Sequence, residues 1–158
     1  MVVRNILLAL IVAGSLAQAD IFKKGKSNFG VSLGTGSSYN NTYTLVGVSG
    51  NYFVIDNLSV GLSYRGWFGA DPMQNELALA TNYFISISKK FRPYVGAFVR
   101  ETLIDGYDNR ESYGVRGGVA MVTKNTFVSL GYAYEHYSTC IKEECSISYP
   151  EIVFGLSF

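Results

Sequence analysis

The only histidine of the chain, His136, stands two residues before Ser138. Residues i and i+2 of an extended strand share a face, so the imidazole and the hydroxyl are expected side by side. A neutral imidazole can take the proton of a serine nucleophile when a carboxylate orients the ring. Glu143, Glu144 and Glu151 are the candidate orienting groups. A two-residue motif is weak evidence for catalysis, and the alternative is a polar pair at a strand end.

Two cysteines, Cys140 and Cys145, follow this pair closely. In an exported chain, two cysteines so near each other favour a disulfide that closes a small loop. Metal binding is the alternative, but it needs more ligands than His136 and the nearby glutamates obviously supply. The sequence therefore predicts a disulfide, with no metal and no cofactor.

The first nineteen residues have the three parts of a secretory signal. Arg4 gives a positive start, residues 6–13 are an apolar run, and Ala17-Gln18-Ala19 is a cleavage site of small residues. The apolar run is too short to span a bilayer, which takes roughly 20 residues. We expect cleavage before Asp20, leaving a mature chain of 158 − 19 = 139 residues that forms one domain.

The mature chain is rich in aromatic residues and glycine, and poor in long apolar runs. The sequence has 12 Tyr, 10 Phe and 17 Gly but only 3 Pro. Such a composition is typical of membrane-spanning strands, because only every second residue meets lipid. The net charge of +1 gives no reason to expect nucleic acid or an acidic partner.

Short segments that alternate between apolar and polar residues follow one another along the chain, as expected of strands. In one of them, Leu58, Val60 and Leu62 share one side, while Ser59 and Gly61 share the other. In a barrel the apolar side faces lipid and small residues fill the narrow interior. The eight predicted strands cover residues 27–35, 42–55, 58–68, 76–88, 92–103, 111–123, 126–138 and 147–158.

The connections between these strands alternate in length. Three are tight, at residues 56–57, 89–91 and 124–125, and four are longer and polar, at 35–41, 69–75, 104–110 and 139–146. Short periplasmic turns and long outer loops are typical of outer-membrane barrels. The sequence therefore predicts an all-β fold: an eight-stranded antiparallel transmembrane β-barrel behind a cleaved signal peptide.

Charged residues fall on the side of the strands that is predicted to face the interior. They are Arg65, Arg100, Arg116, Glu76, Glu135 and Glu151. Because unpaired buried charge is costly, we expect three positive and three negative groups to pair. An eight-stranded barrel is only just wide enough for its own side chains, so this network predicts a blocked bore and no open diffusion channel.

The chain ends in Phe158, with Leu156 and Phe154 behind it at alternate positions. This ending resembles the assembly signal of bacterial outer-membrane barrels. Residues 52–62, 92–97 and 113–119 resemble the small OmpA- and OmpX-like outer-membrane barrels, and the likeness extends over nearly the whole mature chain. It implies a monomer in the outer membrane, surrounded by lipid and lipopolysaccharide and folded by the barrel-assembly machinery. It implies almost nothing about activity.

A weaker resemblance concerns the lipid A deacylases, which are barrels of similar size with a His-x-Ser pair on a late strand and an acid downstream. It implies an esterase that uses His136, Ser138 and Glu151. Thr139 stands where that family usually has Asn, and Glu151 is predicted to face inward. The sequence therefore favours a non-enzymatic barrel with a structural or adhesion-like role through its outer loops. A membrane-embedded esterase is the alternative.

Overall fold

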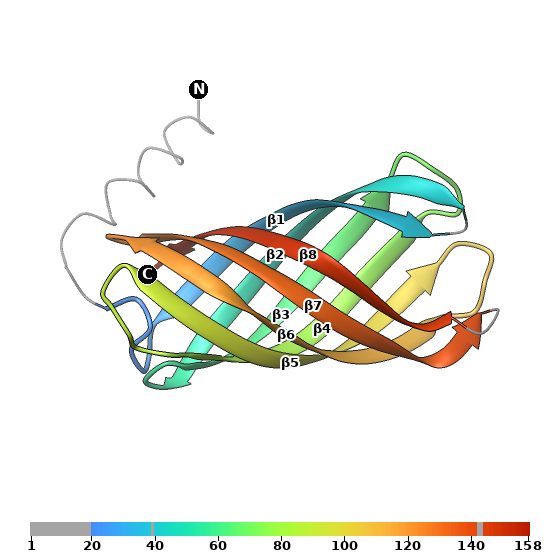
Figure 1. The fold of residues 1–158 in the computed structure, drawn as a ribbon. Coiled ribbons are helices and arrows are strands. Elements are labelled where there is room, and N and C mark those ends of the chain that lie inside the picture. The colour runs from blue at the N-terminus through green and yellow to red at the C-terminus, as the bar shows by residue number, and fades with distance from the viewer. Residues whose placement is uncertain (1–19, 39, 142–143) are drawn as a thin grey trace, which may run out of the picture.

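The chain folds into a closed antiparallel barrel of eight strands (Figure 1). The computed structural model describes residues 20–38, 40–141 and 144–158, so the predicted signal sequence lies outside the described residues. The strands are β1 (Ser27–Ser38), β2 (Asn41–Ile55), β3 (Leu58–Phe68), β4 (Gln74–Phe84), β5 (Phe91–Ile104), β6 (Arg110–Thr123), β7 (Thr126–Ile141) and β8 (Glu144–Ser157). This confirms the predicted fold.

The alternation of the sequence decides which face of each strand is outside. Leu62, for example, is 60 % exposed, while Gly61 and Ser59, at the alternate positions of the same strand, are buried. Large apolar side chains surround the outside of the barrel, and small or polar ones fill the inside. A closed barrel leaves no sheet edge toward lipid and can cross a bilayer. No helix in the described ranges is long and apolar enough to cross a membrane.

The two ends of the barrel differ from the prediction in the length of their connections. We call the end with residues 20–26 and Phe158 the turn end, and the opposite end the loop end (Figure 1). At the loop end, β1 and β2 are separated only by residues 39–40, and β7 and β8 only by 142–143. At the turn end, residues 85–90 form a longer connection than predicted, folded around Ser88 Oγ, which accepts from the amide of Phe91 at 2.8 Å. The predicted sorting into short turns and long loops therefore holds only in part: 56–57 and 124–125 are tight turns and 69–73 and 105–109 are longer loops, whereas the other three connections differ.

The seam that closes the barrel is shorter than the other pairings. β1 pairs with β8 only from Asn28 to Leu33, opposite Ser157 to Ile152. Beyond Leu33 the two strands diverge toward the loop end (Figure 1). Among the described residues, 34–38 of β1 and 144–151 of β8 have no pairing with each other.

A cluster of aromatic side chains fills the turn end. The segment before β1 places Phe22 inside the barrel, where it is 1 % exposed and its ring centroid lies 4.4 Å from that of Phe84 and 5.6 Å from that of Phe53. Arg92 lies over the Phe22 ring and pairs with Asp20 at 2.7 Å. The first residues of the described chain therefore close this end of the bore.

Outside the barrel, the same segment is tied to the turn between β2 and β3. Lys23 Nζ donates to Asp56 Oδ2 at 2.8 Å, and the amide of Asn57 donates to the carbonyl of Phe22 at 2.7 Å. The hydrogen bond from Lys23 lowers the pKa of the Asp56 carboxyl below its ordinary value. A lowered pKa means that the contact stabilises the fold at neutral pH and is lost as the pH falls through that pKa.

Candidate functional site

The middle of the bore holds a network of ionic and hydrogen bonds that joins strands from opposite parts of the barrel. Arg65 on β3 donates from Nε to Glu76 Oε2 on β4 at 2.6 Å, and Arg100 Nε on β5 lies 3.6 Å from the same oxygen. Arg100 Nη1 also donates to Glu135 Oε2 on β7. Because each charge has a partner of opposite sign, the high cost of isolated buried charge is avoided.

Glu135 is the most enclosed member of the network, with no exposed surface. Its carboxylate accepts from three side chains: Arg100, the Tyr149 hydroxyl at 2.9 Å and the Ser112 hydroxyl. The Tyr149 hydroxyl in turn accepts from Arg100 Nη1 at 2.8 Å. Such a closed set of donors and acceptors fixes side chains of β5, β6, β7 and β8 relative to one another.

Arg116 and Glu151 form a looser group nearer the turn end. Arg116 donates from Nε to Asn82 Oδ1 at 2.8 Å, whereas its Nη1 lies 3.7 Å from Glu151 Oε2. The Arg116 side chain is 20 % exposed. The structure thus brings each of the six interior charges to a partner, and it adds Ser112, Asn82 and Tyr149. Tyr149 shares the inward parity of Glu151 on β8, so the alternation pattern could have identified it.

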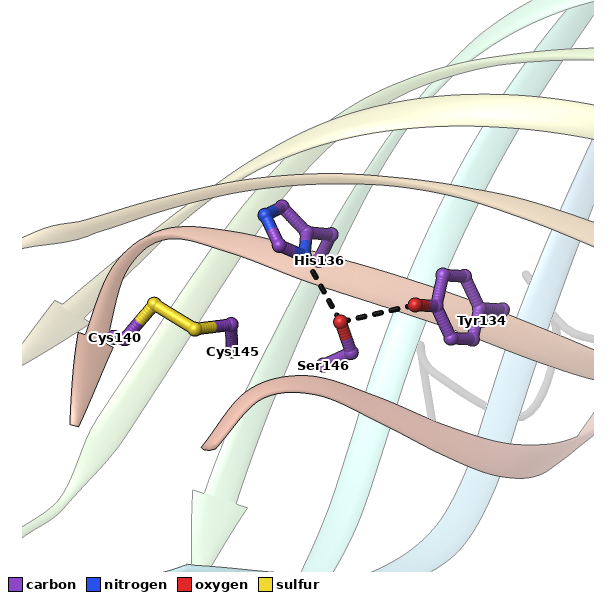
Figure 2. The surroundings of a disulfide bond; sticks show 5 residues. All are labelled: Tyr134, His136, Cys140, Cys145 and Ser146. Atoms are coloured by element: carbon purple, nitrogen blue, oxygen red, sulfur yellow. Dashed lines mark hydrogen bonds between the residues drawn. A yellow bond between two sulfur atoms is a disulfide. The ribbon is translucent and has the colours of Figure 1, made fainter. Parts of the chain in front are cut away.

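His136 lies on the outward face of β7, near the loop end. Its Nδ1 is 2.9 Å from Ser146 Oγ on β8, and the Tyr134 hydroxyl donates to the same oxygen at 3.0 Å (Figure 2). The His136 ring also packs against Tyr113, with 5.3 Å between ring centroids. The hydroxyl beside the imidazole is therefore that of Ser146, across the strand pair, and not that of Ser138.

The structure does not bring Glu151 to His136. Glu151 is on the inward face of β8, where it pairs with Arg116, while His136 faces out. Glu143 and the side chain of Glu144 lie outside the described residues. Among the side chains that the structure does describe, no carboxylate is hydrogen-bonded to His136, and no group of three or more potential metal ligands occurs.

Cys140 and Cys145 form the predicted disulfide, with 4.6 Å between their Cα atoms. The bond joins the ends of β7 and β8 (Figure 2) instead of closing an irregular loop, because both strands continue almost to the tip of the hairpin. It therefore stiffens a β-hairpin that projects at the loop end.

Comparison with solved structures identifies the architecture. The N-terminal β-barrel domain of Pseudomonas aeruginosa OprF matches with a TM-score of 0.61 and 18 % identity, over 85 % of this chain and 98 % of that one. The fold is that of the small outer-membrane β-barrels. Neisserial surface protein A matches with a TM-score of 0.57 and 18 % identity, over 84 % of this chain and 93 % of that one.

A third small outer-membrane barrel with the same fold is Ail, the attachment invasion locus protein of Yersinia pestis. It matches with a TM-score of 0.53 and 12 % identity, over 85 % of this chain and 99 % of that one. No protein-family model matches the sequence, and no curated protein is significantly similar to it. These matches show a shared fold at low identity.

Replacing Glu135 with Leu tests the network. Arg100 would lose its closest anion, and breaking a buried ion pair costs about 3–5 kcal/mol. We expect the free energy of unfolding, measured by urea titration in detergent micelles, to fall by about that amount. Glu111→Leu is the matched control, because Glu111 is exposed on β6, and it should change stability by less than about 0.5 kcal/mol. Equal stability of Glu135→Leu and the native protein would contradict a structural role for the network.

Proposed function

We propose that the protein is an integral outer-membrane barrel that works by surface contact at its loop end, in a structural or adhesion-like role. The filled interior is the observation that carries this proposal. Phe22, Phe53 and Phe84 occupy the bore at the turn end, and the network around Glu135 occupies its middle. Transport of solutes along the axis is therefore disfavoured, which leaves the outward surface as the place of function.

The β7–β8 hairpin is the element best suited to recognition. The disulfide between Cys140 and Cys145 links the ends of β7 and β8, and a cross-link of this kind lowers the entropy lost when a partner binds. Nearby at the loop end, the connection between β5 and β6 presents exposed Asp105, Tyr107 and Asp108. An aromatic ring among carboxylates favours a partner with basic groups.

The solved relatives support surface contact by analogy of fold. One is named a neisserial surface protein and another an attachment invasion locus protein. Both match this chain over more than nine-tenths of their own length. Fold alone does not determine function, so the support for this chain comes from the filled bore together with the stiffened hairpin.

Attachment of bacteria that express the protein to cultured epithelial monolayers tests the proposal. We expect the native protein to raise attachment above that of cells with an empty vector. The double variant Cys140→Ser/Cys145→Ser should lose most of this gain, because the hairpin tip is no longer held in one shape. Lys89→Ala, at the opposite end of the barrel, is the control and should attach as the native protein does. If bacteria with the native protein attach no better than bacteria with the empty vector, the proposal is overturned for epithelial surfaces.

An esterase acting on lipid A is the second candidate, and one observation favours it. Ser146 Oγ accepts from Tyr134, so its own proton is free to point to His136 Nδ1, as required of a serine activated by a base. Against it, the packing of the His136 ring on Tyr113 is a sufficient structural role for this histidine. The serine in this candidate is Ser146.

Mass spectrometry of lipid A from expressing cells separates the two candidates. We expect lipid A identical to that of the empty control, because no described carboxylate is bonded to His136 to orient its ring. Loss of an acyl chain that disappears in His136→Ala and Ser146→Ala but persists in Ser138→Ala would instead make the protein an esterase. Gel mobility before and after heating would confirm that each variant is folded.

A further inference from the structure

A cavity of about 410 Å³ lies inside the loop-end half of the barrel, beside the ion network. Its wall comes mainly from β1, from the facing parts of β2 and β3, and from β8. The inward positions of β1 in this region, Ser32, Gly34 and Gly36, carry little or no side chain. A Cβ atom added at Gly34 would meet nothing within 4 Å. The network occupies one side of the bore, and this cavity is the space left on the other.

The cavity is lined at the seam by residues of both β1 and β8. Its lining includes inward residues and also Leu33, Ser148, Pro150 and Ile152, whose positions alternate with the inward ones. These residues lie at or beyond Leu33 and Ile152, the last pair of the seam. Pro150 has no backbone N–H to offer a neighbouring strand. For β1 and β8, an opening where the strands have separated accounts for the outward positions in the lining.

The position of the opening relative to the membrane follows from the residues that face outward around it. Leu33 and Ile152, at the last pair, are apolar. Beyond them the outward positions are Thr35 and Ser37 on β1 and Pro150, Ser148 and Ser146 on β8, of which only Pro150 is apolar. The opening therefore lies where the hydrocarbon gives way to polar headgroups. Unpaired strand edges are tolerated at membrane depth only where they line a cavity, which fits this location.

The groups inside the cavity suit an acidic head on an apolar chain. Three arginines of the interior line it, and each is paired with a glutamate, Arg100 with Glu135 behind the lining. Two buried donors that line it, Trp67 Nε1 and Arg100 Nε, have no hydrogen-bond partner in the part of the chain that is described. Both can only donate, so they favour a ligand that accepts. Leu45 and the Trp67 ring provide an apolar surface next to these donors.

We propose that this cavity binds a small single-chain amphiphile with an acidic head, such as a medium-chain carboxylate, taken up through the opening between β1 and β8. The volume is at the lower end of small-molecule sites, roughly 300–1,000 Å³. The apolar chain lies toward the opening and the seam. The acidic head accepts hydrogen bonds from Trp67 and from the arginines. Binding here requires no passage along the bore, because the turn end stays closed by the Phe22 cluster.

The only tryptophan of the chain lines the cavity, so its fluorescence reports occupancy directly. The probe is 2-bromodecanoate, whose bromine lies beside the head group bound at Trp67 and quenches the indole, added to the folded protein in bromine-free micelles. We expect saturable quenching that unbrominated decanoate reverses. Gly34→Leu places a side chain in the open space of the cavity and should remove the saturable part. Gly50→Leu is the matched control, since Gly50 also has nothing within 4 Å but stands on an outward position of β2, and it should quench as the native protein does.

The head group is tested with 2-bromodecanol, which has the same chain and no charge. We expect the carboxylate to bind the native protein roughly tenfold more tightly than the alcohol, as a charge-assisted hydrogen bond would give. Arg116→Gln, which keeps a donor for Asn82, should reduce this preference. Absence of saturable quenching in the native protein, or equal quenching in Gly34→Leu, would overturn the proposed site. Equal affinity for the acid and the alcohol would overturn the assignment of an acidic head.

Discussion

The pairing of Arg100 with Glu135 at the centre of the bore is the interaction on which the rest of the interior depends. An eight-stranded barrel has room inside for little more than its own side chains, and a carboxylate with no exposed surface needs hydrogen-bond donors to replace water. Arg100, Tyr149 and Ser112 do this for Glu135. Their strands, β5, β6, β7 and β8, are consequently fixed as one wall, with Arg65 and Glu76 continuing the network to β3 and β4.

The two remaining strands carry different residues inside, and the asymmetry of the barrel follows from this. The inward positions beside the cavity are small at Ser32, Gly34 and Gly36 of β1 and at Gly47 and Ser49 of β2, whereas Tyr43 and Leu45 of β2 pack on Trp67 nearer the loop end. These inward positions of β1 and β2 contribute no charge to the network. The charged side chains come from the other strands, and the cavity remains beside β1. The same part of β1 has lost its pairing with β8. The filled centre of the bore and the cavity beside β1 therefore have one cause: large charged side chains point inward from β3 to β8, and small ones point inward from β1.

Much of the fold could be predicted from the sequence, because the period of two along each strand is set by the contrast between lipid outside and small or polar groups inside. The same alternation predicted which charged residues face the interior. The ends of the strands could not be predicted: polar residues at 139–146 read as a loop, yet cross-strand pairing and the disulfide carry β7 and β8 almost to their tip. The sequence could not predict the partner of His136 either. Ser146 lies beside it because of the register between β7 and β8, which spacing along a single strand does not reveal.

Single-channel recording in planar bilayers, with protein shown to be folded by its gel mobility, tests most directly whether the axis is filled. The Phe22 cluster and the Glu135 network are predicted to leave no continuous water path, so the folded native protein should give no steady conductance steps in concentrated salt. Steady, ohmic steps from the folded protein would mean that ions pass the centre of the barrel. That result would contradict the closed interior and the surface role argued from it.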